Sequence, residues 1–416
     1  MPLRRVGRLG RNTVYTTVAL GLRAIMQAAY LILLSRTMGP NEYGLFAGSV
    51  AAAVLLAPLS GWGVSMLVSE RVGKDHAAGR RMWAGVLTQT AWTGGLLSIG
   101  VLLCVLALPD RLAVGPMTML VLSELLVVPM TQSASALMLA LGRGAAGSIV
   151  VCIIPALRLA AVGTWMLASD AFDGSSVAAM HVIGSVIGGA IVMAIVRNVV
   201  GDADWNARPP IRDMLARGKA YAFGLLVSAA YTEVDKVLLL QLANATVAGL
   251  YTTAFRVAAV LAIPVTALTG NALPRLFGVA GTPDWGRMFR AVAAASAAYA
   301  VGIAIVVFFA AGLMPVVFGA EFSHSTEYLR MLSPWIVLYA AHMVLATGLT
   351  SIGRQNTRVA IEAFGLAMVI AINVALIPTF GARGAVYALL ATDATVATAC
   401  AVVLLRTLRQ SRPQTR

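Results

Sequence analysis

The stretch Arg36-Thr-Met-Gly-Pro-Asn-Glu-Tyr-Gly-Leu-Phe46 is a short polar turn between two long apolar runs, Thr13 to Leu34 and Tyr43 to Val68. Gly39-Pro40 ends the first run, because proline cannot continue a helix and holds the residue before it in an extended conformation. A weaker copy, Gln241-Leu-Ala-Asn-Ala-Thr-Val-Ala-Gly-Leu-Tyr251, separates two further apolar runs at an offset of 205 residues, close to half the chain. The chain therefore consists of two related halves, each opening with the same helix-turn-helix.

The composition is typical of a membrane protein. Hydrophobic residues make up 59% of the chain and charged residues only 12%, whereas a soluble domain carries about 25% charged residues. Apolar runs long enough to cross a bilayer, roughly 20 residues, recur along the whole chain. The basic N-terminus could mark a secretory signal, but the first run is long, contains Arg23 and lacks a small-residue cleavage site. We therefore predict a retained first span and an all-α integral membrane protein.

Twelve transmembrane helices are predicted, and their loops differ in charge. The predicted spans are 13–34, 44–68, 82–107, 116–141, 148–168, 176–197, 217–242, 249–270, 288–312, 327–348, 357–378 and 383–406. Loops on one side, both termini included, carry 23 basic residues, against only Arg36, Arg111 and Arg383 on the other. By the positive-inside rule both termini lie in the cytoplasm. The same asymmetry accounts for most of the net charge of +14, so nucleic acid is not needed as a partner.

The repeat predicts an N-terminal six-helix lobe at 1–200, a cytoplasmic linker at 201–219 and a C-terminal six-helix lobe at 220–416. Six spans are an even number, so both lobes have the same orientation in the membrane. Cys104, Cys152 and Cys400 stand alone in apolar runs and are predicted to be small core residues. The chain has no phosphate-loop, zinc-protease or serine-hydrolase motif. We therefore predict no catalytic residue, metal or cofactor, and disfavour a membrane-embedded glycan enzyme.

Three segments carry a family resemblance. The turn from Arg36 to Phe46 is similar to an R-x-L-G-P-x-x-Y-G-L-F pattern, with Met38 where leucine is usual. The segment from Asp235 to Arg256 and the segment from Ile377 to Ala388 match two further patterns of the same family. On these residues the chain resembles polysaccharide-biosynthesis flippases, the Wzx-like branch of the multidrug/oligosaccharidyl-lipid/polysaccharide exporter superfamily.

The resemblance implies two six-helix lobes around a central cavity lined mainly by the first, second, seventh and eighth spans. It implies a flippase that turns a lipid-diphosphate-linked oligosaccharide from the cytoplasmic to the outer leaflet of a bacterial inner membrane by alternating access. The expected partners are this polyprenyl-diphosphate type of substrate, membrane lipids and other polysaccharide assembly proteins. Multidrug exporters share the fold, so a cation-coupled exporter of small molecules is the alternative.

Charged residues inside the spans are the candidate site residues, because a charge at mid-bilayer costs on the order of 3 kcal/mol or more and normally faces a cavity or a partner. Arg23, Lys236 and Arg256 lie on spans that the resemblance places around the cavity. We predict that they bind the diphosphate, whose oxygens an arginine can bind bidentately. Alternatively, Lys236 pairs with Asp235, and Arg256 ties the two repeats together. Asp393 has no obvious local partner and is the candidate for proton or sodium binding.

Other charges are predicted to be structural or gating groups. Glu124 and Arg330 hold nearly equivalent repeat positions, as do Arg158 and Glu362, and each pair combines opposite charges. A Glu124–Arg158 pair is also plausible, because their spans are adjacent in sequence. Asp235 belongs to the same structural group. His181 and His342 are predicted to be polar packing residues rather than metal ligands.

Overall fold

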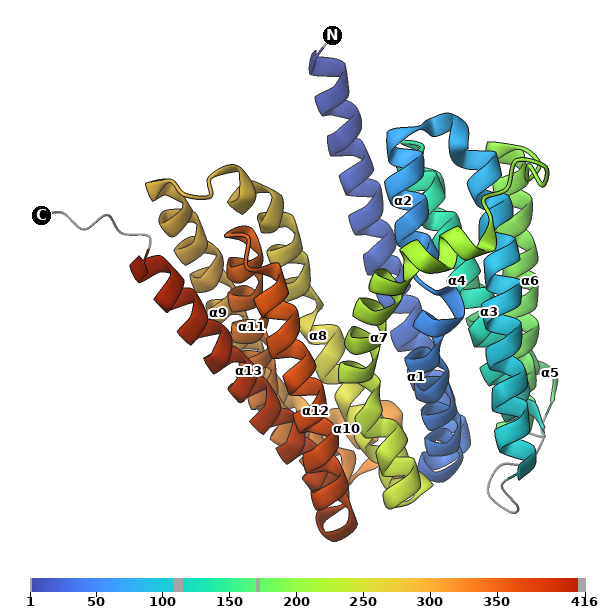
Figure 1. The fold of residues 1–416 in the computed structure, drawn as a ribbon. Helices are drawn as coiled ribbons and strands as arrows, with labels where there is room; N and C mark the ends of the chain where they lie inside the picture. Colours follow the sequence, from blue (N-terminus) through green and yellow to red (C-terminus); the bar gives the residue numbers. More distant parts are fainter. Residues whose placement is uncertain (1, 108–114, 170–172, 411–416) are drawn as a thin grey trace, which may run out of the picture. The chain divides into compact units, whose positions relative to one another are not determined.

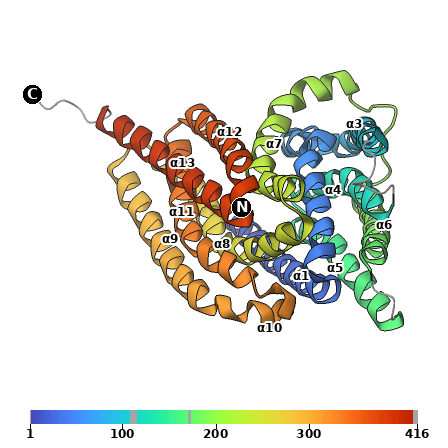
Figure 2. The ribbon, with the colours of Figure 1, turned by 90° about the horizontal axis from the view of Figure 1, so that it is seen from below.

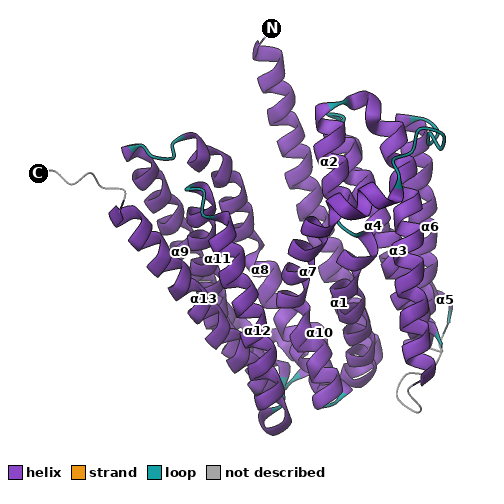
Figure 3. Cartoon of the chain, in the orientation of Figure 1, coloured by secondary structure: helices purple, strands orange, loops and turns teal. Residues whose placement is uncertain are grey.

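The computed structural model describes residues 2–107, 115–169 and 173–410, and these residues form helices and short connections with no strand (Figure 1; Figure 3). The α-helices are α1 (Pro2–Gly61), α2 (Val64–Lys74), α3 (Gly79–Ala107), α4 (Pro116–Ala140), α5 (Gly144–Ala168), α6 (Gly174–Val200), α7 (Ile211–Leu242), α8 (Ala245–Gly278), α9 (Pro283–Ala310), α10 (Met314–Phe318), α11 (Ser325–Ser351), α12 (Gln355–Phe380) and α13 (Ala382–Gln410). Short 3-10 helices lie at His76–Ala78 (η1), Ala311–Leu313 (η2) and Ala320–Phe322 (η3). Ten helices in the described part are long and apolar enough to cross a membrane, which confirms the predicted fold class.

The helix α1 contains the first two predicted spans, joined by a kink at Gly39. This residue has φ 65° and ψ 173°, a backbone conformation outside the helical region that glycine adopts without a side-chain clash. The break predicted at Gly39-Pro40 is therefore present. The second predicted span, 44–68, was too long, because the helix ends at Gly61. Trp62 and Gly63, with φ of 44° and 70°, turn the chain before α2 begins at Val64.

The seventh predicted span, 217–242, lies within α7, which is not among the ten apolar helices. Charged residues stand toward both of its ends, Arg217 and Lys219 near the start and Asp235 and Lys236 near the end. They lower the hydropathy of the helix without interrupting it.

Helix starts follow from local sequence. Asp173 caps α6, where its carboxylate accepts a hydrogen bond from the backbone N–H of Ser176 at 2.8 Å and the Ser176 hydroxyl accepts one from the Asp173 backbone N–H at 3.2 Å. Asn244 caps α8 by accepting from the N–H of Val247 at 2.9 Å. Pro283 stands in the first turn of α9, where a missing N–H costs nothing. These caps fix where the apolar helices begin.

The chain divides into two compact units, Met1–Met38 with Phe46–Glu233, and Gly39–Leu45 with Val234–Arg416. In the first unit α4 contacts α2, α3, α5 and α6, and in the second α11 contacts α8, α9, α12 and α13 (Figure 2). The membrane-spanning windows of α4 and α11 are 56% and 61% buried, more than those of the other apolar helices in the described part. Each unit is therefore organised around one central helix, the fourth predicted span of its half. The lobe boundaries at 200 and 220 stay a prediction.

Within the second unit, the two repeated turns contact each other through equivalent residues. A Cβ atom placed on Gly44 would lie 1.7 Å from the backbone oxygen of Ala245, and one placed on Gly249 would lie 2.1 Å from that of Pro40. The hydroxyl of Thr246 donates to the side-chain oxygen of Asn41 at 3.4 Å, and these two residues are 205 positions apart. Each contact is thus repeated with the two turns exchanged.

At one end of the first unit, two loops predicted to share the cytoplasmic side lie together. The Nε of Arg80 donates to the backbone oxygen of Asp202 at 2.8 Å, and the N–H of Asp204 donates to the backbone oxygen of Arg80 at 3.2 Å. Arg80 belongs to the predicted loop 69–81, and both aspartates belong to 197–219. The two loops therefore lie at the same end of the first unit, and the cytoplasmic location of this end stays a prediction.

The cysteines are free where the structure describes them. Cys400 is buried in the core of the second unit. Cys152 is half-buried on α5, and its thiol donates to the backbone oxygen of Ala19 at 3.4 Å. The side chain of Cys104 lies outside the described residues.

Candidate functional site

Buried polar networks within each unit are the candidate functional groups. The first network lies in the first unit and joins Glu124 of α4, Arg158 of α5 and His181 of α6. Arg158 forms an ion pair with Glu124 Oε1, and His181 Nε2 lies 2.7 Å from the same oxygen. The hydroxyl of Tyr30 on α1 lies 2.9 Å from His181 Nδ1. Because a carboxylate only accepts, Nε2 donates to Glu124, and in the neutral ring Nδ1 accepts from Tyr30.

This network shows which of the predicted pairings exists. Glu124 pairs with Arg158, one of the alternatives raised by the sequence, and the two side chains are only 4% and 14% exposed. Glu362 instead lies 2.7 Å from Arg358, one turn earlier on α12. Arg330 is exposed near the start of α11. The structural role of these charges stays a prediction, but their contacts connect helices of one half.

Register explains why the proposed equivalence of Glu124 with Arg330 was wrong. The turns after α4 and α11 match in sequence and hydrogen bonding: the N–H of Arg143 donates to the backbone oxygen of Met138, and that of Arg354 to Leu349. Gly142 and Gly353 both have positive φ, 73° and 79°. The offset between the halves is larger here than at the opening turn, because η2, α10 and η3 precede α11.

Arg23 lies close to this first network without an acidic partner in its unit. Its side chain is half-buried on α1, within electrostatic range of Cys152 and Arg158. No carboxylate of the described first unit forms a salt bridge with it, because Glu124 is engaged by Arg158 and His181. The apolar part of this unit therefore holds the guanidinium groups of Arg23 and Arg158 against one carboxylate. This local excess of positive charge suits an anionic ligand.

Lys236 is enclosed in a second network, within the second unit. Its Nζ lies 3.0 Å from Asp235 Oδ1 and 3.6 Å from the centre of the Phe255 ring. Tyr251 donates its hydroxyl to the other carboxylate oxygen of Asp235. The lysine and aspartate are only 1% and 3% exposed. In this conformation the ammonium is thus neutralised and covered, so a ligand would reach it only after these contacts change.

Arg256 follows this network on α8. It is half-buried, and Thr252, four residues earlier on the same face, is fully buried. Arg23 belongs to the first unit, whereas Lys236 and Arg256 belong to the second. Their predicted meeting around one cavity stays a prediction.

Asp393 is not unpartnered, contrary to expectation, and forms the centre of a third network. Its Oδ2 accepts from Trp335 Nε1 at 2.6 Å, and its Oδ1 accepts from His342 Nδ1 at 2.8 Å. The other ring nitrogen of His342 lies 3.7 Å from Glu362 Oε1. Trp335 and His342 are on α11, far from Asp393 in sequence, so no local pattern indicated this contact. A histidine lying between two carboxylates is a chemically suitable place to hold a proton.

No group of three or more His, Cys, Asp or Glu side chains that could hold a metal ion is present in the described part of the chain. Both buried histidines instead contact carboxylates on neighbouring helices.

The sequence of the chain matches a known protein family. Residues 9–278 match the model of a family described as polysaccharide biosynthesis protein. No curated protein sequence matches the chain. Among solved structures, an inward-facing multidrug resistance MATE family transporter of the MOP superfamily is similar, with a TM-score of 0.72 and 14% identity over 96% of this chain and 100% of that one.

Two further structures have the same fold. The outward-facing conformation of a multidrug resistance MATE family transporter of the MOP superfamily has a TM-score of 0.66 and 13% identity, over 98% of this chain and 97% of that chain. A MOP superfamily transporter from Pyrococcus furiosus, described as having a binding pocket of reverse polarity, has a TM-score of 0.70 and 13% identity, over 97% and 96%. At these identities the likeness concerns the fold.

Proposed function

Since the chain belongs to the polysaccharide biosynthesis protein family and has the fold of membrane transporters, we propose that it is a flippase for a lipid-diphosphate-linked oligosaccharide. It carries this precursor of a cell-surface polysaccharide from the cytoplasmic to the outer leaflet by alternating access. The proposed location is the bacterial inner membrane, with both termini in the cytoplasm. The protein moves its substrate without changing covalent bonds, so it is a transporter rather than an enzyme.

The observation that carries this proposal is the excess positive charge around Arg23. A permanent cation in an apolar helix is costly unless a partner compensates its charge. Glu124 cannot do this for Arg23 alone, because it already forms an ion pair with Arg158. A diphosphate supplies concentrated negative charge and oxygens that match the guanidinium fork. We propose that Arg23 captures the diphosphate, and that Lys236 and Arg256 contact it in another step of the cycle, when Lys236 has left Asp235.

In this proposal, ion binding at the third network couples an ion gradient to transport. A proton or sodium ion at Asp393 changes the charge that Trp335 and His342 stabilise, and an ion that binds one access state better shifts the population toward it. The same network supports a second candidate function, a cation-coupled exporter of small molecules. The solved structures with this fold include multidrug transporters.

Reconstituted vesicles separate the two functions. Purified protein is inserted into vesicles that contain a fluorescent lipid-diphosphate-linked oligosaccharide, and its appearance in the opposite leaflet is measured with a membrane-impermeant quencher. Wild-type protein flips the lipid, Arg23→Ala abolishes flipping, and Arg23→Lys restores part of it, because an ammonium keeps the charge but loses the planar fork. Gly21→Ala, two residues away at a site with nothing within 4 Å, is the matched control.

Normal flipping by a folded Arg23→Ala variant would remove the cationic residue on which the mechanism rests. Transport of organic cations but not of the lipid-linked glycan by wild-type protein would replace the flippase with the exporter. Size-exclusion profiles of every variant show whether it is folded, so that a loss of transport is not confused with a loss of structure.

A further inference from the structure

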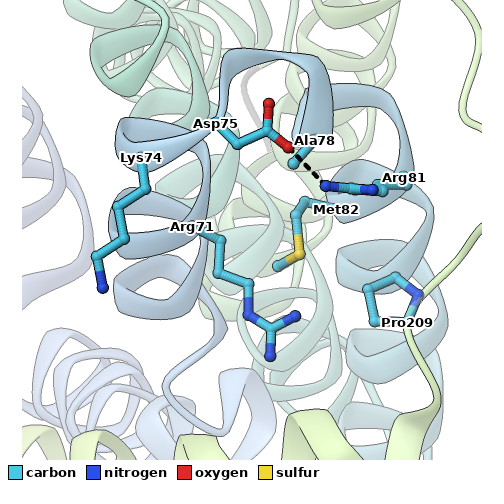
Figure 4. A pocket seen from close by; sticks show the side chains of 7 residues that line it. All are labelled: Arg71, Lys74, Asp75, Ala78, Arg81, Met82 and Pro209. Carbon is cyan, nitrogen blue, oxygen red and sulfur yellow. Dashed lines mark hydrogen bonds and ion pairs between the residues drawn. The ribbon is translucent and has the colours of Figure 1, made fainter.

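A pocket of about 220 Å³ opens at one end of the first unit, and none of the residues that line it belongs to the three buried networks (Figure 4). Its wall is built from α2, η1 and α3 and from the connection that precedes α7. Met82 is buried beneath it and Pro209 forms one side. The charged groups that line it are Arg71, Lys74, Asp75 and Arg81.

The lining charges leave an excess of positive charge. Asp75 is the one acid among them, and both of its oxygens are engaged: Oδ2 lies 2.6 Å from Arg81 Nη2, and Oδ1 accepts from the N–H of Ala77 at 3.0 Å. Lys74 reaches outward to Glu70 at 2.8 Å, a pair exposed to solvent. Figure 4 shows the guanidinium of Arg71 extending from α2 toward Pro209. Arg71 lies within electrostatic range of Glu70, but no salt bridge joins the two side chains.

The shape and chemistry favour a phosphate group as the ligand. A guanidinium binds two oxygens of one phosphate through parallel hydrogen bonds, and a lysine adds a second charge from a flexible stem. Arg71 and Lys74 stand one turn apart on α2 and can act on one group. Basic pockets at helix ends are also where membrane proteins hold lipid headgroups. Trp205, on the same connection as Pro209, is 52% exposed, as expected of an indole at a membrane interface.

We propose that this pocket is a phosphate-binding site, which takes the phosphate of an anionic lipid headgroup or of a soluble phosphate-bearing ion. Arg71 makes the bidentate contact, Lys74 adds charge from the outer side, and the Arg81–Asp75 pair holds the rim. The site goes beyond the proposed transport function, because it requires neither a glycan nor movement of the lipid across the membrane.

Binding is measured on the full-length purified protein at physiological ionic strength. One arm titrates inorganic pyrophosphate into protein in a neutral detergent by calorimetry. The other uses native mass spectrometry of protein from nanodiscs that contain phosphatidylglycerol and phosphatidylcholine. Retention of phosphatidylglycerol that pyrophosphate does not displace identifies a lipid source, and calorimetric binding of pyrophosphate identifies a soluble source.

Matched variants locate the site. Arg71→Gln weakens binding about tenfold, since it removes a charge-assisted bidentate contact. Lys74→Gln weakens binding about threefold. Because the Lys74 side chain is 75% exposed, this substitution leaves folding undisturbed. Arg197→Gln removes the same charge outside the pocket, at a side chain that is 74% exposed and bound to Asp202, and changes binding by less than about twofold.

Two results would overturn the assignment. One is wild-type protein that binds neither pyrophosphate nor phosphatidylglycerol. The other is an equal loss in Arg71→Gln and Arg197→Gln, which would mean that diffuse surface charge attracts the anion and that the pocket has no part in binding.

Discussion

Replacing Gly44 by alanine tests the contact between the two repeated turns. The added Cβ would lie 1.7 Å from the backbone oxygen of Ala245 and 2.6 Å from its carbonyl carbon. Gly249→Ala meets the same obstacle from the other side, 2.1 Å from the oxygen of Pro40. Both obstacles are backbone atoms, which no rotamer change can move. The helices must therefore separate, by about 1.5 Å if a carbon–oxygen contact of roughly 3.3 Å is to be restored.

The expected cost follows from two opposing terms. Alanine favours a helix over glycine by about 1 kcal/mol, because glycine loses more backbone entropy on folding. Overpacking costs about 3 kcal/mol when backbones have to part, the upper end of the usual range. We therefore expect each substitution to lower the free energy of unfolding by about 2 kcal/mol, roughly a thirtyfold change in the ratio of folded to unfolded protein.

The assay is reversible unfolding of purified protein by titration of a denaturing detergent, followed by intrinsic fluorescence. Gly21→Ala on α1 and Gly270→Ala on α8 are matched controls, since a Cβ at either site meets nothing within 4 Å. The double substitution of Gly44 and Gly249 should cost less than the sum of the single ones, because one separation relieves both clashes. A Gly44→Ala protein as stable as the Gly21→Ala control would refute the close contact.

Three further predictions follow from the topology and the networks. Reporter fusions should read as cytoplasmic after Gly201, Gly281 and Arg416 and as external near Asp173 and Ser323; an external signal at Gly281 would break the parallel repeat. Asp393→Asn should slow gradient-driven transport roughly tenfold while substrate binding persists. Trp335→Phe removes one hydrogen bond to Asp393 and should slow transport less. Unchanged transport by Asp393→Asn at every imposed gradient would exclude Asp393 from coupling. Lys236→Gln should lower the free energy of unfolding by about 3 kcal/mol, because it leaves Asp235 buried without its cation, and adding Asp235→Asn should recover most of this loss; a fully stable single variant would show that the pair is dispensable.

Local chemistry made much of the fold predictable from the sequence. Proline cannot continue a helix and the glycine before it can adopt a positive φ, so the break inside α1 could be located to the residue. Long apolar runs indicate helices because a bilayer leaves backbone groups no other partners. The Glu124–Arg158 pair was among the alternatives, because adjacent helices pack side by side and a buried charge needs a counterion.

Other features depend on contacts that a sequence does not display. The turn at Trp62-Gly63 lies inside a continuous apolar run, and Trp62 donates its indole N–H to the backbone oxygen of Leu215, which is distant in sequence. Asp393 was expected to lack a partner because its donors, Trp335 and His342, come from α11. Periodicity places a residue on one side of its helix, but it does not say which helix lies opposite.

The two halves use corresponding helices for opposite charges. In the first half, α4, α5 and α6 are joined by Glu124, Arg158 and His181; in the second, α11, α12 and α13 are joined by His342, Glu362 and Asp393. In the first network Arg158 is paired with Glu124 and Arg23 lies nearby, whereas in the second network two carboxylates contact His342 and Glu362 also contacts Arg358. The backbone contact of the opening turns is shared by both halves, but the buried charges of the two halves differ. The two guanidinium groups near one carboxylate in the first half suit an anionic headgroup, and the histidine between two carboxylates in the second half suits a proton or sodium ion. In the proposed transporter this difference would let one half bind the anionic substrate and the other the coupling ion, and an ion that binds one access state better shifts the population toward that state.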